Sequence, residues 1–231
     1  LLWDNHYTYT SPCSPSRATI FTGKYIHQHG VKENSSTNNN TQLNTGYLKL
    51  GKSLKDLGYY TAYKGKWHLQ SKPQLQMEEF GFADWFGNDM SFWGLPNSGT
   101  EYDPLIYKET YQWLKNHSHD KKPYMNCSQI TKSLSSHIDL ARTIIDLAGG
   151  SDHQLENFEG KSLTRLLNDP SKTVRNSVYF AQEWPWYPGV EKVRYANTGY
   201  FDGKINYSRY YGIGGGVTNL GLKKNKNESY K

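Results

Sequence analysis

The sequence contains little cysteine and no long hydrophobic run. Cys13 and Cys127 are the two cysteines in 231 residues, so disulfide bridges cannot form the framework of the fold. No stretch of about 18 or more apolar residues occurs, which argues against a membrane span. The sequence also starts at Leu1 without a methionine or a signal-peptide pattern, and we expect the natural N-terminus to lie further upstream.

Apolar residues are scarce as well, at 35% of the chain, and the mean hydropathy is −0.83. Seven tryptophans and 19 tyrosines compensate, because aromatic side chains bury large areas. The length fits one large domain or a domain and a half. The formal charge of +6 suits an anionic substrate, although much of the excess lies in the lysine-rich tail 222–226, which we expect to be solvated. Basic and aromatic residues show no groove-like clustering, so no nucleic-acid partner is expected.

A chemically informative segment lies at residues 9–25. It predicts a helix over residues 14–23, with Ser14 as the cap, Pro15 at the first helical position and Gly23 as the end. Cys13 then sits just before a helix N-terminus, which favours negative charge and lowers the pKa of a thiol. Arg17 follows one turn later and can reach the same point. The segment predicts a site for a tetrahedral oxyanion, the alternative being a small buried cysteine.

A second segment follows a predicted inner strand at Tyr59–Tyr63. Lys66 and His68 stand where the strand ends, the edge at which open α/β sheets bind ligands, and residues two apart on an extended segment share a side. An ammonium group that holds an anion and an imidazole that moves a proton form a sensible pair. The alternative is a surface lysine and a packed polar histidine.

Together the two segments resemble the signatures of the type I sulfatases. Residues 13–17 read CSPSR, residues 21–24 read FTGK in place of a segment like LTGR, and residues 65–69 read GKWHL at the interval that the family shows. The resemblance implies that Cys13 is converted to formylglycine. It further implies that Arg17 orients that residue beside a Ca²⁺ ion, that Lys66 binds the sulfate, and that His68 hydrogen-bonds the formylglycine hydroxyl.

The chemistry implied is hydrolysis of sulfate esters. The aldehyde hydrates to a geminal diol, one hydroxyl attacks sulfur, and the second lets the aldehyde re-form as sulfate leaves, which splits one hard step into two. The implied partners are a formylglycine-generating enzyme and a sulfated small molecule or sulfated sugar. The implied compartment is secreted, periplasmic or lysosomal. A secretory route is also permitted by glycosylation sequons, which begin at Asn34, Asn39, Asn116, Asn126, Asn206 and Asn227.

The sequence departs from the family after residues 121–125, which resemble the entry to a core strand. The central region that normally supplies metal ligands is missing, and residues 136–150 already resemble the helix near the end of the catalytic domain. His137 belongs to that helix start and is not expected to be catalytic. Of the implied Ca²⁺ ligands, the chain therefore retains Cys13, as formylglycine, and lacks the others.

The predicted fold is α/β: an alkaline-phosphatase-like mixed sheet between helices, incomplete, with a small C-terminal antiparallel sheet built from strands at 178–180, 193–195 and 205–207. We divide the chain into three parts. Residues 1–126 are the N-terminal part of the catalytic domain, 127–170 its end, and 171–231 a small C-terminal subdomain with a basic tail.

Further elements are predicted between these segments. They are an exposed loop at 30–46, a helix from Leu48 to Gly58, an aromatic rim including Trp85, Phe86, Phe92 and Trp93, and a helix at 105–116 whose apolar side holds Leu105, Tyr111 and Leu114.

Three other functions stay open beside a sulfatase. One is a non-catalytic remnant that binds a sulfated ligand. Another is a phosphate or phosphonate monoester hydrolase of the same superfamily, because the two kinds of ester share geometry. The third is hydrolysis by the unmodified Cys13 thiol.

Overall fold

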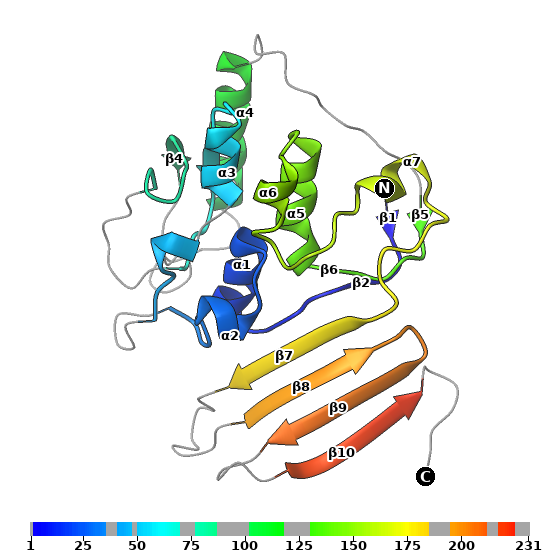
Figure 1. Cartoon of the computed structure of the whole chain (residues 1–231). Coiled ribbons are helices and arrows are strands. Elements are labelled where there is room, and N and C mark those ends of the chain that lie inside the picture. Colours follow the sequence, from blue (N-terminus) through cyan, green and yellow to red (C-terminus); the bar gives the residue numbers. More distant parts are fainter. Residues whose placement is uncertain are drawn as a thin grey trace.

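The structure, a computed structural model, describes residues 2–35, 41–47, 50–69, 77–86, 102–117, 130–184, 195–211 and 217–224. Helices gather in one part of the molecule, and an antiparallel sheet forms the other (Figure 1). In the described ranges the helices are α1 (Cys13–Thr22), α2 (Ile26–His29), α3 (Leu50–Asp56), α4 (Tyr102–Asn116), α5 (Ile138–Leu147), α6 (Asp152–Leu155) and α7 (Thr164–Asn168), with a 3-10 turn η1 (Thr45–Tyr47). The strands are β1 (Leu2–Trp3), β2 (His6–Tyr7), β3 (Ala62–Lys64), β4 (Asp84–Phe86), β5 (Ile130–Thr131), β6 (Ser135–Ser136), β7 (Val178–Trp184), β8 (Tyr195–Phe201), β9 (Ile205–Tyr211) and β10 (Val217–Lys224).

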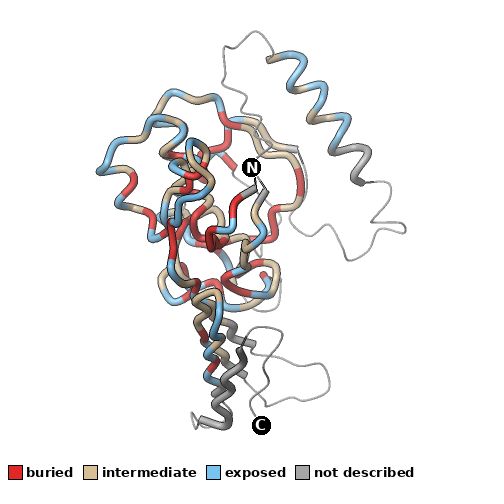
Figure 2. Tube along the Cα trace, turned by 90° about the vertical axis from the view of Figure 1, so that its right-hand side faces the viewer, coloured by how far each residue is buried: buried red, intermediate tan, exposed pale blue. Residues whose placement is uncertain are grey.

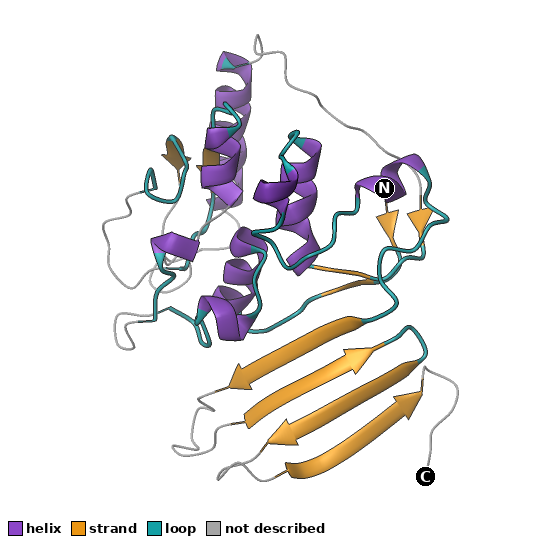
Figure 3. Ribbon diagram, in the orientation of Figure 1, coloured by secondary structure: helices purple, strands orange, loops and turns teal. Residues whose placement is uncertain are grey.

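The short strands of the helical part pair in parallel. β1 pairs with β5, β2 with β6, and β3 with β4; helices lie along the chain between the partners of the first two pairs (Figure 3). Parallel strands connected through helices define an α/β fold, so the predicted class is confirmed. Within the described residues these strands form three separate two-stranded ladders and no continuous sheet.

The predicted inner strand at Tyr59–Tyr63 begins three residues too early. β3 runs from Ala62 to Lys64 and its residues are only half-buried. Tyr59 instead closes the turn after α3, where its N–H donates to the carbonyl of Leu54. The Tyr60 ring is 48% exposed and stacks on His117 beside α4. The run of β-prone residues is thus divided between a turn and a strand, because tertiary contacts outweigh propensity.

The C-terminal sheet has four antiparallel strands in the order β10-β9-β8-β7, as the sequence predicts for this region. The predicted strands at 178–180 and 205–207 extend to full seven-residue strands, β7 and β9. Residues 193–194 lie outside the described residues, and β8 begins at Tyr195. Residues 222–224 of the tail, which we predict to be solvated, belong to the edge strand β10 and pair with β9.

The core lies where α1 meets the segment that follows β3. Trp67 and Phe80 are fully buried there, and Phe21 of α1 packs against Trp67 with ring centroids 4.9 Å apart. Phe21 also reaches a second cluster between α3 and α5 that contains Ile145 and Phe158. Figure 2 shows the buried residues gathered in the body of the molecule. Helix α1 is therefore held from two sides, which fixes its N-terminus in space.

The end of α1 is set by Gly23. Its φ of 58° is left-handed, a conformation that favours glycine, and its N–H donates to the carbonyl of Thr19. The ring of Phe158 lies against it, leaving no room for a β-carbon, and the N–H of Glu159 donates to its carbonyl at 2.8 Å. The predicted stop at Gly23 is confirmed, and it anchors α1 to the chain after α6.

Two other predictions need correction. The loop at 30–46 is not exposed throughout, because Val31, Ser35 and Leu43 are buried. The helix predicted at 105–116 is α4, but its predicted apolar side is not packed: Tyr111 and Leu114 are 58% and 56% exposed.

The helix predicted to end at Gly58 is confirmed as α3. Of the predicted aromatic rim, Trp85 packs against the core, while Phe92 and Trp93 lie outside the described residues. Among the helices described, none has the length and apolar character that crossing a bilayer requires.

Candidate active site

Helix α1 begins at Cys13 itself. The cap residue is Pro12, and its side chain makes no capping hydrogen bond. The prediction of Ser14 as cap and Pro15 as first helical residue is therefore wrong by two positions. Pro15 remains within the first turn, where its missing N–H leaves no helical bond unmade. Cys13 therefore lies in the first turn of α1 and not before it. It is still beside the free N–H groups at the positive end of the helix.

Ser14 does not cap the helix because its hydroxyl is used elsewhere. Its Oγ donates to the carbonyl of His68 at 2.5 Å and accepts from the N–H of Ser35 at 3.0 Å. The Ser14 N–H donates to Asn34 Oδ1 at 3.0 Å. Ser14 is fully buried. It therefore joins the two segments that the sequence singles out and fixes His68 beside the start of α1.

Arg17 points back along α1 to Cys13. Its Nε donates to Cys13 Sγ at 3.1 Å, and one terminal nitrogen donates to the carbonyl of Lys66 at 2.5 Å and to the hydroxyl of Tyr63 at 3.3 Å. The Tyr63 hydroxyl itself donates to the same Lys66 carbonyl. The guanidinium is thus held by Lys66 and Tyr63 at a terminal nitrogen, while its Nε donates to residue 13.

His68 has a strained backbone and a buried ring. Its φ of 56° is positive, which is uncommon for a residue with a β-carbon and typical of functional sites. The side chain Nε2 lies 3.1 Å from the carbonyl of Ser35. Nδ1 has no partner of hydrogen-bond geometry among the described residues. The ring lies close enough to Cys13 to influence the pKa of its thiol, and we interpret this as a close approach rather than a formed hydrogen bond.

The other three predicted site residues act together on the thiol of Cys13. Burial raises its pKa, but the neighbouring His68 imidazole, the hydrogen bond and charge of Arg17, and the charge of Lys66 outweigh burial and lower the pKa to about 6. The arrangement stabilises negative charge at residue 13. The structure therefore brings Cys13, Arg17, Lys66 and His68 into one site, while their catalytic roles remain predictions.

The described residues do not fit a Ca²⁺ ion. Such an ion takes six to eight oxygen ligands, with carboxylates prominent among them. No group of three or more His, Cys, Asp and Glu side chains able to hold a metal occurs in the described part of the chain. The charged neighbours of Cys13 are cations, and Asp4 is exposed. We therefore derive no step through a metal.

Sequence reasoning missed the supporting residues. Tyr63 was expected only as a strand residue, yet its hydroxyl fixes both Lys66 and Arg17. His137, set aside as structural, lies 3.2 Å from Ser16 Oγ of α1, and its ring is 5.2 Å from that of His6. The contacts of Tyr63 with Arg17 and of His137 with Ser16 join residues 46 and 121 positions apart, so no local signal could have found them.

Comparison with known proteins identifies the family of this chain. The Sulfatase family model matches residues 1–129, more than half of the chain. An N-acetylglucosamine-6-O-sulfatase of Bacteroides thetaiotaomicron is 38% identical over 107 residues, which are 46% of this chain and 16% of that protein. Human N-acetylgalactosamine-6-sulfatase is 33% identical over 117 residues, which are 47% of this chain and 22% of that protein. The chain belongs to the sulfatase family.

Solved structures agree on the fold. The sulfatase YidJ of Bacteroides fragilis superposes with a TM-score of 0.70 at 13% identity, over 95% of this chain and 80% of that one. At this identity the likeness bears on the fold alone. It confirms the predicted alkaline-phosphatase-like architecture, here incomplete, with its small antiparallel sheet. The sequence matches, by contrast, span only about a fifth of the relatives' length.

Proposed function

We propose that this chain serves the hydrolysis of sulfate esters, with residue 13 as the nucleophile. The observation that carries the proposal is the convergence of Arg17, Lys66 and His68 on Cys13 at the start of α1. Three cationic or hydrogen-bonding groups and a helix N-terminus suit a tetrahedral oxyanion. Family membership supports sulfate over phosphate, since the two anions have the same shape and the geometry by itself does not separate them.

We propose that Cys13 is converted to formylglycine by a modifying enzyme. An aldehyde at this position would supply, as its hydrate, one hydroxyl to attack sulfur and a second to expel sulfate. The neighbouring side chains then have definite tasks. Arg17 keeps residue 13 oriented and stabilises its negative charge, and Lys66 neutralises sulfate oxygens. His68 can hold or move a proton at the hydroxyl that attacks or leaves.

Two buried polar atoms support a ligand at this point. His68 Nδ1 and Ser35 Oγ have no hydrogen-bond partner among the described residues, although buried polar atoms are normally paired. Both residues contact the start of α1, through Ser14 and through each other. A sulfate group or a hydrated aldehyde at residue 13 would offer the oxygens that these atoms lack.

For the substrate we propose a sulfated sugar, and a 6-sulfated amino sugar as the first candidate. The support is that two relatives above 30% identity are named for 6-sulfated amino sugars. A Ca²⁺ requirement stays a proposal from the family resemblance, and the described residues do not account for it. The non-catalytic remnant and the phosphate or phosphonate hydrolase have no specific observation in their favour.

The test combines mass and turnover. The chain is produced with and without a formylglycine-generating enzyme, and its intact mass is measured, because conversion of thiol to aldehyde lowers it. Hydrolysis of 4-nitrophenyl sulfate and 4-nitrophenyl phosphate is then followed. We expect turnover of the sulfate ester only by the converted chain, and none by Cys13→Ala. Equal turnover by unconverted chain would favour the thiol as nucleophile, and faster turnover of the phosphate ester would overturn the assignment to sulfate.

A further inference from the structure

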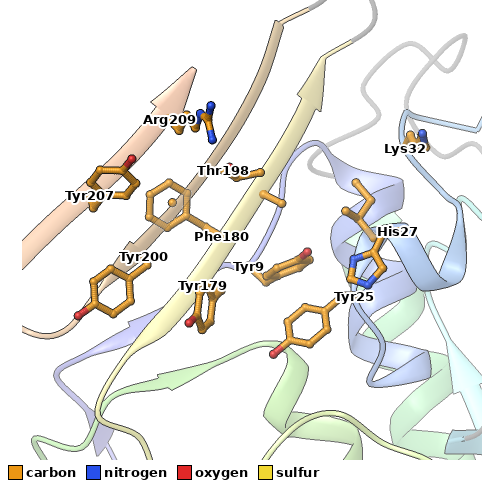
Figure 4. Close-up of a pocket in the computed structure, with 13 residues that line it drawn as sticks. Tyr9, Tyr25, His27, Lys32, Tyr179, Phe180, Thr198, Tyr200, Tyr207 and Arg209 are labelled. Atoms are coloured by element: carbon orange, nitrogen blue, oxygen red, sulfur yellow. The ribbon is translucent and has the colours of Figure 1, made fainter. Parts of the chain in front are cut away.

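A cavity lies between α2 and one face of the C-terminal sheet (Figure 4). Its volume is about 760 Å³, within the roughly 300–1,000 Å³ range of small-molecule sites. Cys13, Arg17, Lys66 and His68 are not among the residues that line it. The cavity is therefore a separate feature from the candidate active site.

The sheet wall of this cavity is a row of tyrosines. Tyr179 on β7, Tyr200 on β8 and Tyr207 on β9 are direct cross-strand partners, so their side chains leave the same face of the sheet. Tyr179 and Tyr207 are 57% and 39% exposed. Arg209 lies two residues beyond Tyr207, on the same face of β9. The sheet thus presents aromatic rings with a guanidinium beside them.

The opposite wall comes from the chain before α1 and from α2. Tyr9 and Tyr25 meet edge to face with centroids 5.1 Å apart, and His27 stacks on Tyr25 at 5.9 Å. Tyr9 is buried, and its carbonyl accepts from the N–H of Ala181 on β7 at 2.9 Å, which ties the two walls together. Figure 4 shows Tyr9 and Tyr25 between β7 and α2.

The cavity wall carries basic groups. His27, Lys32 and Arg209 belong to the lining residues that the structure describes, and no Asp or Glu does. Glu159 lies outside this lining, and the charge of His27 helps to lower its pKa. Aromatic faces bind the apolar faces of sugar rings, and cations bind sulfate groups. From this combination we propose that the cavity binds a sulfated oligosaccharide away from residue 13. The choice of a sulfated sugar over other ring-bearing anions rests on the proposed function.

The cavity is connected to the active site through a short segment. Lys32 lines the cavity, and two residues later Asn34 accepts the N–H of Ser14 at the start of α1. Ser35 then contacts both Ser14 and His68. The cavity and the candidate active site are thus linked through residues 32–35. The cavity is an accessory site that retains a polymeric substrate while one of its units reacts.

Direct binding tests this proposal. The background is the full chain carrying Cys13→Ala and Lys66→Ala, which disables the active site. The probes are a chondroitin 6-sulfate hexasaccharide and the same hexasaccharide after removal of sulfate, measured by isothermal titration calorimetry. We expect Tyr179→Ala, Arg209→Gln and their combination each to weaken binding of the sulfated probe about tenfold or more. The desulfated probe should bind at least about tenfold more weakly to the parent chain.

The matched control carries Tyr111→Ala and Lys204→Gln, which remove an exposed tyrosine and a lysine outside the cavity and should leave affinity unchanged. Tyr179 and Arg209 are exposed, so their substitution should leave the thermal unfolding temperature within a few degrees. Equal affinity in parent and cavity variants, or in both probes, would overturn the proposal. Cavity-dependent binding without turnover of 4-nitrophenyl sulfate by the converted chain would reject the proposed function alone.

Discussion

Arg17 Nε donates to Cys13 Sγ at 3.1 Å, one helical turn back along α1. Because Arg17 and its neighbours lower the pKa of the unmodified thiol to about 6, the thiolate dominates above that pH and is lost as the pH falls through it. We expect alkylation of Cys13 by iodoacetamide to show a midpoint near pH 6, against about 8.5 for an unperturbed cysteine. The rate is measured from pH 4 to 10 in a Cys127→Ser background.

The same experiment on Arg17→Met should raise the midpoint by about one pH unit or more, because a hydrogen bond and a positive charge are removed together. Lys24→Met, a substitution at the other end of α1, serves as the control and should leave the midpoint unchanged. A midpoint near 8.5 in the parent chain would mean that the site does not stabilise negative charge at residue 13.

Tyr63→Phe should weaken anion binding without unfolding the chain. Its hydroxyl bridges the Lys66 carbonyl and the Arg17 guanidinium, so its loss frees both groups to move. We expect the sulfate concentration that half-protects Cys13 from alkylation to rise about tenfold, as for loss of a charge-assisted hydrogen bond. Tyr59→Phe is the control, because its hydroxyl donates to the carbonyl of Ala148, at 3.4 Å, and makes no contact with the described residues of the site. Equal protection of Cys13 by sulfate in both variants would mean that the Tyr63 hydroxyl does not position Arg17 or Lys66.

His29 should make the fold sensitive to acid. Burial and the nearby His27 lower its pKa to about 4. Its Nδ1 accepts from the N–H of Val31, so Nε2–H donates to Thr19 Oγ1 in the neutral ring. The folded pKa lies below the unfolded value of 6.5, so stability is retained above pH 6.5 and falls as the pH drops toward 4. The free energy of unfolding, measured with urea, should be about 2 kcal/mol lower at pH 4.5 than at pH 7.5 because of His29 alone.

His29→Gln supplies the comparison, because its side-chain amide keeps a donor and an acceptor but does not titrate in this range. In the variant, the difference in the free energy of unfolding between pH 7.5 and pH 4.5 should be smaller by about that amount. An undiminished difference would assign the acid sensitivity to other groups. His6 and His137 are the first candidates, since burial lowers the pKa of each.

The buried pair of Asp139 and Arg175 should dominate the stability of the region around α5. Asp139 is fully buried and accepts from Arg175 through both oxygens, and also from the N–H groups of Ser136 and Lys161. Arg175→Met leaves a buried carboxylate without its cation and should cost about 3–5 kcal/mol in urea unfolding. The exposed pair of Lys24 and Glu159 is the matched control, and Lys24→Met should cost at most about 1 kcal/mol. Equal losses would mean that Arg175 contributes no more than a surface charge.

The sequence was sufficient for features whose causes are local. The stop at Gly23 follows from a left-handed residue that glycine tolerates. The clustering of Lys66 and His68 near Cys13 has no local cause, and it was expected from the family resemblance of two short motifs. The start of α1 was misplaced by local reasoning, because Ser14 is an ordinary cap residue in isolation. Its hydroxyl is drawn instead into buried hydrogen bonds with His68 and Ser35, 54 and 21 residues away.

The same limit explains the other misses. Tyr60 looks like a strand residue until its stacking on His117 beside α4 is known. Tyr179, Tyr200 and Tyr207 read as ordinary strand residues, and only the register of β7, β8 and β9 places them side by side. The spacing within one strand shows which residues share a face. It does not show which residues of another strand stand opposite them.

The ladder between β2 and β6 joins His6 to Ser135 across 129 residues. During synthesis at about 5–20 residues per second, the first strands must wait on the order of ten seconds before their partners are made. Through that interval the start of α1 lacks the contacts that come from beyond residue 130. Ser14 and Pro15 are buried in the finished fold, so the modifying enzyme that we propose would have its best access to the residues around Cys13 during this delay. The order of strand pairing would then set a time limit on the proposed conversion of Cys13.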